Sequence, residues 1–116
     1  MSESRTASQV IVDEVTSWPG MESALGERGE LSLRLGRREI GHLHGDRAAH
    51  FGFPREVAAE LRAAGRITPH PAFPDHPGWG ARRIADAADV ADVIAILRIN
   101  YDRAVARHGV PETSAS

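Results

Sequence analysis

Alternation of apolar and polar residues in the first half of the chain predicts antiparallel strands. Leucines alternate with polar residues over 31–35, and this period of two is typical of a strand with one buried face. After a two-residue break, residues 39–44 read as a second strand, which makes a hairpin with the first. Further strands are predicted over residues 48–51 and 79–84.

Apolar residues recur at steps of three and four in three other segments, as they do along one face of a helix. The first helix is expected to begin with Ser8 as its N-cap, and the second to run from Pro54 to Gly65. The third follows Asp86, its N-cap, and continues to residue 109. Its periodic positions are Val90, Ile94, Leu97, Tyr101 and Val105.

This succession of elements, α-β-β-β-α-β-α, predicts an α+β fold. We expect an antiparallel sheet of about four strands with helices packed on one face. The other face of such a sheet is either solvated or used for function. The compact domain is expected over residues 9–109. Residues 1–8 and 110–116 are expected to be flexible tails, because they are polar and contain little to bury.

Composition narrows the classes of protein to which the chain can belong. Its 116 residues suit one domain, and the absence of cysteine excludes disulfides, thiolate nucleophiles and zinc ribbons. No apolar run approaches the roughly 18 residues that span a bilayer. The polar start lacks the apolar stretch of a signal peptide, so we expect a cytoplasmic protein without membrane contact. The net charge of −2 argues against a nucleic-acid partner.

Histidines are the most suggestive candidates for chemistry. His42 and His44 are two apart on a predicted strand, so both imidazoles lie on one face, with Cα atoms about 7 Å apart. Two histidines at this spacing can share a metal ion. Asp46 continues the same parity and could supply a carboxylate. The proline-rich loop over 68–78 could fold back and add further ligands. The histidines available to complete such a site are His50, His70 and His76.

Each of these residues also has other readings. His42 and His44 could be hydrogen-bonded polar positions, or general acid/base groups with a pKa near 6.5 in an isomerase or cyclase step. Trp79 could stack on a ligand, although packing in the core is the commoner role of tryptophan. Arg38 could contribute to a small anion site. The sequence contains no dinucleotide-binding, P-loop, hydrolase-elbow or metalloprotease motif, so it names no cofactor.

The string Arg38-Glu39-Ile40-Gly41-His42-Leu43-His44-Gly45-Asp46 resembles the luciferase-like domains. These are small actinobacterial and fungal proteins, or domains of larger ones, of unknown activity. The similarity extends over residues 18–106. It continues through Phe53-Pro54, the helix end Glu60 to Gly65, His70, Gly78-Trp79 and residues 96–101. The chain departs from the family pattern at residues 80–83 and at Asn100.

We therefore predict a luciferase-like domain that binds a small molecule or a metal ion on the sheet face of His42 and His44. The loop over 68–79 is expected to form one wall. The residues expected to contact the ligand are Asp46, His70, Trp79 and Arg38. The alternative is an interaction module without catalysis, in which the same face binds a partner protein or a second copy of the chain.

Overall fold

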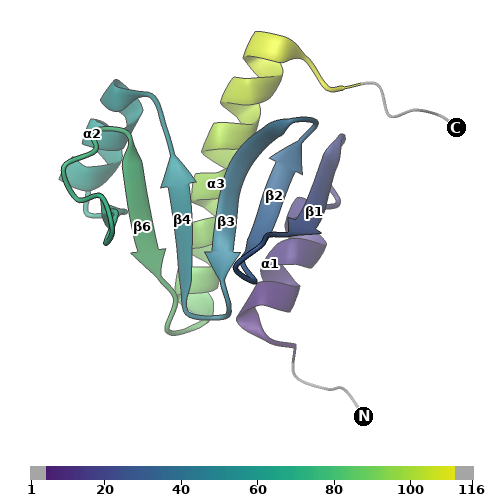
Figure 1. Cartoon of the computed structure of the whole chain (residues 1–116), viewed down its shortest axis with the longest axis horizontal. Helices are drawn as coiled ribbons and strands as arrows, with labels where there is room; N and C mark the ends of the chain where they lie inside the picture. The colour runs from purple at the N-terminus through teal and green to yellow at the C-terminus, as the bar shows by residue number, and fades with distance from the viewer. Residues whose placement is uncertain (1–4, 112–116) are drawn as a thin grey trace, which may run out of the picture.

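The computed structural model describes residues 5–111, and the α+β class is confirmed (Figure 1). In chain order the elements are α1 (Ala7–Val15), β1 (Met21–Leu25), β2 (Leu31–Leu35), β3 (Arg38–His44), β4 (Ala48–Gly52), α2 (Arg55–Ala63), β5 (Thr68–Pro69), β6 (Trp79–Arg83) and α3 (Ala87–His108). The strands form one antiparallel sheet in the order β1-β2-β3-β4-β6-β5. Of the expected tails, residues 1–4 and 112–116 lie outside the described part.

The sheet has six strands, so the expectation of about four is wrong. Strand β1 lies at one edge, pairs only with β2, and buries Met21 alone. Strand β5 is two exposed residues of the proline-rich loop, paired with β6. Edge strands with so little buried surface show no apolar alternation. Their pairing depends instead on the free edge of the neighbouring strand.

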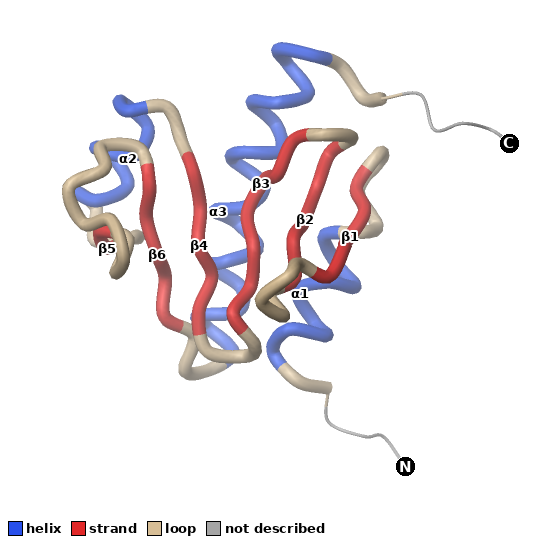
Figure 2. Tube along the Cα trace, in the orientation of Figure 1, coloured by secondary structure: helices blue, strands red, loops and turns tan. Residues whose placement is uncertain are grey.

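Helices α1 and α3 cover one face of the sheet and leave the other open (Figures 1 and 2). The core forms between these helices and the covered face. Its fully buried members include Ile11, Leu33, Leu43, Ile96 and Leu97. Tyr101 is also buried, and its hydroxyl donates a hydrogen bond to the carbonyl oxygen of Pro19 at 2.7 Å. None of the helices within residues 5–111 is long and apolar enough to cross a membrane.

Side-chain caps mark the first turns of α1 and α3, and the cap predicted for α1 is wrong. Helix α1 begins at Ala7, and its N-cap is Thr6, which forms a capping box with Gln9. The expected cap, Ser8, lies inside the helix, because the glutamine three residues after Thr6 completes the reciprocal bonds that define the box. Helix α3 begins after Asp86 as predicted, and the Asp86 carboxylate accepts a hydrogen bond from the Asp89 N–H.

A β-bulge in β3 changes which side chains share a face. The register pairs Leu33 with Gly41 but Arg34 with Glu39, so Ile40 is an extra residue in β3. Ile40 turns into the core, where it is 2% exposed. As a result, Glu39 and His42 point to the same side of the sheet, although a spacing of three in a regular strand would separate them.

Beside the bulge, a side chain of α3 joins two strands. The pairing of β3 with β4 runs from His44 only as far as His42 opposite His50. Past this pair, the Asn100 amide donates hydrogen bonds to the carbonyl oxygens of Ile40 and Gly52, at 2.8 and 2.9 Å. Asn100 therefore links β3 to β4 just past the point where their direct pairing stops.

Candidate functional site

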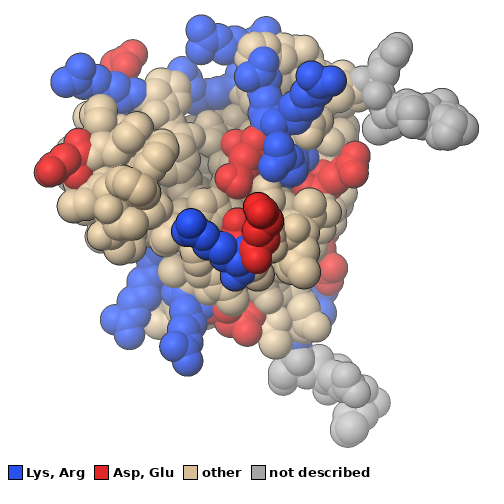
Figure 3. Space-filling view, in the orientation of Figure 1, with Lys and Arg blue, Asp and Glu red and all other residues tan. Residues whose placement is uncertain are grey.

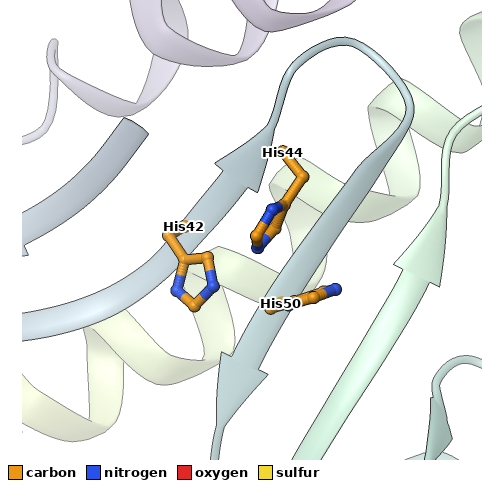
Figure 4. Close-up of side chains that lie close together, drawn as sticks. All are labelled: His42, His44 and His50. Carbon is orange, nitrogen blue, oxygen red and sulfur yellow. The ribbon is translucent and has the colours of Figure 1, made fainter. Parts of the chain in front are cut away.

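Three histidines meet on the open face of the sheet (Figure 4). His42 and His44 alternate along β3, and His42 lies directly opposite His50 of β4. Residues opposite one another in antiparallel strands project to the same side. The sheet register therefore adds His50 to the pair that the sequence predicted.

The three imidazoles are close enough to share one ion. Their ring centroids are 4.8 Å apart for His42 and His44, 5.1 Å for His42 and His50, and 4.1 Å for His44 and His50. One nitrogen from each ring can be chosen so that all three lie within 4.8 Å of one another. In a tetrahedral zinc site the ligand nitrogens are about 3.4 Å apart, since each bond is about 2.1 Å long. Small side-chain rotations span the difference.

A carboxylate orients the first of these rings. Nδ1 of His42 lies 3.2 Å from Oε1 of Glu39. The other oxygen of Glu39 accepts a hydrogen bond from the Ser32 hydroxyl, which accepts one from Arg34. When Nδ1–H of His42 donates this hydrogen bond to Glu39, the lone pair of the neutral ring is on Nε2. This carboxylate–histidine arrangement recurs around protein-bound metals.

Glu39 was not among the residues predicted for the site. It is part of the string that resembles the luciferase-like domains. Its distance of three residues from His42, however, places it on the opposite face of any regular strand. Only the bulge at Ile40 brings the two side chains together.

Burial and mutual repulsion favour the neutral rings of His44, His50 and His70. Burial, with the nearby His44, His70 and His42, lowers the pKa of His50 to about 4. Burial also lowers the pKa of His44 and of His70, and the neighbouring histidines add to both shifts. A neutral imidazole has one nitrogen with a free lone pair, and this is the form of histidine that binds metals. Nδ1 of His50 is buried without a hydrogen-bond partner within residues 5–111.

The proline-rich loop folds beside the cluster and forms one wall. The ring of His70 lies 4.5 Å from that of His50 and 5.7 Å from that of Trp79. His76 stacks on Trp79 at 4.0 Å with an interplanar angle of 10°. From α2, Arg62 donates hydrogen bonds to the carbonyl oxygens of His76 and Trp79, which tie the loop to the domain.

Trp79 lies at the rim and not in the core. Trp79 is 37% exposed, and neighbouring Phe73 is 55% exposed, with the two rings 5.1 Å apart. On the open face, Trp79 lies opposite Gly52 of β4. Gly52 has no side chain that could cover the indole. The commoner core role therefore does not apply to this tryptophan.

Two adjoining hollows lie between the histidines and this wall. Their volumes are about 520 and 220 Å³, and His42, His50, His70 and Trp79 line both. The larger one extends along the loop before β2 and the proline-rich loop. Its other lining residues are Glu27, Arg28, Glu30, His44, Pro71, Ala72 and Phe73.

Two of the predicted contact residues lie elsewhere. Asp46 turns towards α1, where its carboxylate accepts a hydrogen bond from the Ser8 N–H at 2.8 Å. That hydrogen bond lowers the pKa of Asp46. Arg38 lies at the start of β3, where Nη2 is 3.2 Å from Nδ1 of His108. The structure thus brings together His42, His44, His70 and Trp79, but neither Asp46 nor Arg38 joins them.

Comparison with known proteins identifies a family. A family model described as Luciferase domain matches residues 37–100, which include the three histidines, Glu39 and the loop with Trp79. No curated protein matches the chain, and no solved structure matches it.

Proposed function

The chain belongs to the luciferase domain family, and we propose that its open sheet face binds a divalent transition-metal ion together with a small molecule. His42, His44 and His50 are the proposed metal ligands. The observation that carries the proposal is the convergence of these three rings, one of them held by Glu39.

The donor set indicates the kind of metal. Imidazole nitrogens suit zinc, copper, iron and nickel, whereas magnesium and calcium prefer oxygen ligands. Three protein ligands leave at least one coordination position for a water or a substrate, as in catalytic zinc sites. Structural zinc sites use four protein ligands, so we favour a reactive site over a purely structural one.

The hollows beside the metal ligands fit a small molecule with a flat apolar part. Their volumes lie near the range of roughly 300–1,000 Å³ for ligand pockets. Trp79 and Phe73 offer aromatic surface at the rim, and His70 lies between Trp79 and His50. When His42, His44 and His50 serve as ligands, their lone pairs are occupied. His70 is then the imidazole of the lining that is free to accept a proton from a molecule in the hollow.

The metal proposal is tested by zinc binding to the chain and its variants. We expect the wild type to bind zinc with near-unit stoichiometry by calorimetry and elemental analysis. His42→Ala, His44→Ala and His50→Ala should each weaken binding at least tenfold. Glu39→Gln should weaken it by about 10–100-fold, because it removes the charge that orients His42. His108→Ala removes an imidazole outside the cluster and should leave zinc affinity unchanged.

Thermal unfolding of the same variants guards against a purely structural explanation. His44 is exposed, so its loss should leave the melting temperature nearly unchanged. Absence of binding by the wild type to zinc, nickel and cobalt overturns the proposal. Large destabilisation of the alanine variants with no metal bound would assign the three rings to structural hydrogen bonding, whose loss costs about 1–3 kcal/mol.

Exposed Phe73 and Trp79 favour a second candidate function, the binding of a protein partner or of a second copy at the same face. Self-association through this face should appear by light scattering at micromolar concentration. It should be lost in the variant Phe73→Ser/Trp79→Ser. A monomeric wild type argues against a homodimer.

A further inference from the structure

A third hollow, of about 200 Å³, lies where β3 begins, β4 ends and the last turns of α3 pass. Basic groups from two distant parts of the chain line it: Arg38 from β3, and Arg103, Arg107 and His108 from α3. Figure 3 shows basic side chains gathered at this end of the molecule, in the upper part of the view.

These arginines are free of the ion pairs that neutralise several others. Within residues 5–111, Arg66, Arg82 and Arg98 each have a carboxylate within 4.0 Å, whereas Arg38, Arg103 and Arg107 have none. Glu39 lines the hollow, but its two oxygens contact His42 and Ser32. The lining therefore carries three guanidinium groups against the one carboxylate of Glu39, an excess of positive charge.

The contact between Arg38 and His108 adds a further donor. Nδ1 of His108 lies 3.2 Å from the guanidinium of Arg38 and can accept its hydrogen bond only as a neutral ring. Desolvation and the charges of Arg38 and Arg107 lower the pKa of His108, which favours that form. The proton of the neutral ring is then on Nε2, so the ring keeps an N–H group to donate.

Attraction to the negative end of the α3 dipole explains only some of these basic residues. Arg107 and His108 lie in the last turn of α3, where positive charge is favourable. Arg103 lies a turn earlier, and Arg38 comes from a strand 70 residues away from His108. A hollow between these groups is the arrangement expected of an anion site, because guanidinium groups bind oxyanions through pairs of parallel hydrogen bonds.

We propose that this hollow binds the oxyanion of a small organic molecule, a phosphate or carboxylate group held by Arg38, Arg103 and Arg107. The hollow shares Glu39 and Gly52 with the 220 Å³ hollow of the histidine face. A molecule anchored by its acidic group can therefore extend towards Trp79 and the histidines. This extension rests on the proposed function, whereas the oxyanion site does not.

Titration with small anions tests the oxyanion site. Inorganic phosphate and acetate are added to the protein at constant ionic strength, and binding is followed by amide chemical shifts. We expect saturable shifts in residues that line the hollow, and the tighter of the two anions identifies the preferred group. Arg103→Gln and Arg107→Gln should each weaken binding at least tenfold, since charged hydrogen bonds are lost. Arg83→Gln makes the same charge change away from the hollow, because Arg83 lies opposite Ala48 at the start of β4 and the hollow lies at the end of β4. This control should weaken anion binding less than twofold.

Two results overturn the oxyanion site: no saturable binding by the wild type, or equal weakening in Arg83→Gln and Arg103→Gln. Zinc binding measured on the same proteins keeps the two proposals separate. Arg103→Gln should retain zinc affinity, and His42→Ala should retain phosphate affinity. A wild type that binds phosphate but not zinc therefore contradicts the metal site alone. A wild type that binds zinc but not phosphate contradicts the oxyanion site alone.

The extension towards the histidine face has its own test. Phenyl phosphate should bind more tightly than inorganic phosphate to the wild type, because its ring can extend past Gly52 into the 220 Å³ hollow that Trp79 lines. Trp79→Ala should remove that advantage without changing the affinity for inorganic phosphate. Equal affinities of the wild type for the two phosphates would overturn the extension.

Discussion

The histidine cluster shows how the chemistry of a residue depends on its neighbours. His50 is an ordinary polar position of β4 until the register places it opposite His42 and beside His44. Its ring is then partly buried and close to three others, and proton uptake becomes unfavourable. The same crowding that disfavours a proton provides several nitrogen ligands for a metal.

We expect this cluster to make folding sensitive to mild acid. The pKa of His50 is lowered to about 4 in the folded state, from 6.5 for an exposed histidine. The unfolded chain therefore takes up a proton at higher pH, so the free energy of unfolding falls as the pH drops from 6.5 towards 4. The lowered pKa values of His44 and His70 act in the same direction.

Urea unfolding at pH 7.5 and pH 5, with a chelator present, measures this effect. His50→Gln cannot titrate, so it should lose less stability than the wild type between the two pH values. The comparison uses the difference between pH values within each protein. Any constant cost of the substitution therefore cancels. Equal pH dependence in the two proteins would contradict the assignment.

At the scale of elements, the site depends on how closely α3 approaches β3. Gly41 lies on the covered face beside the bulge, and a Cβ atom there would be 2.6 Å from Cδ2 of Leu97 and 3.1 Å from the His50 carbonyl oxygen. The absence of a side chain lets the helix pack directly on the strand. Asn100, one turn after Leu97, can then reach the two strands.

Gly41→Ala should therefore destabilise the domain by about 1–3 kcal/mol, the usual cost of overpacking a core. Gly52→Ala is the matched control, because its Cβ would meet only Trp79, at an ordinary contact of 3.6 Å. We expect the control to change the free energy of unfolding by less than about 0.5 kcal/mol. Chemical denaturation measures both, and similar values for the two variants would contradict this packing.

For the whole molecule, the distribution of charge matters more than its total. The net charge is −2, yet all 14 basic residues are arginine, and a group of them collects around the end of α3 (Figure 3). Acidic side chains elsewhere offset this local excess. The arrangement suits a small anion in a hollow better than a long polyanion, which needs an extended basic surface.

Affinity for random duplex DNA should therefore be weak at physiological salt. Neutralisation of phosphates by basic residues supplies most non-specific binding, and a chain with excess acidic charge provides little of it. Fluorescence anisotropy with a labelled duplex at about 0.15 M salt measures this affinity. A sub-micromolar, salt-sensitive dissociation constant would refute the expectation.

Local pattern in the sequence was enough to predict the three helices, the hairpin of β2 and β3, and the shared face of His42 and His44. The reason is that periodicity reports how a single segment buries one side against the rest of the chain. The string around His42 likewise identified the family that the match over residues 37–100 confirms. These features depend on neighbours in sequence or on burial alone.

Pairing between segments decided the rest. Strands β1 and β5 form because a neighbouring strand offers a free edge, and neither buries enough surface to leave a pattern. The bulge at Ile40 turns Glu39 towards His42, and the register of β3 with β4 adds His50. Only the folded chain brings Arg38 to the end of α3. Strand register, bulges and contacts between distant segments depend on residues far apart in the sequence. Periodicity within one segment therefore does not predict them.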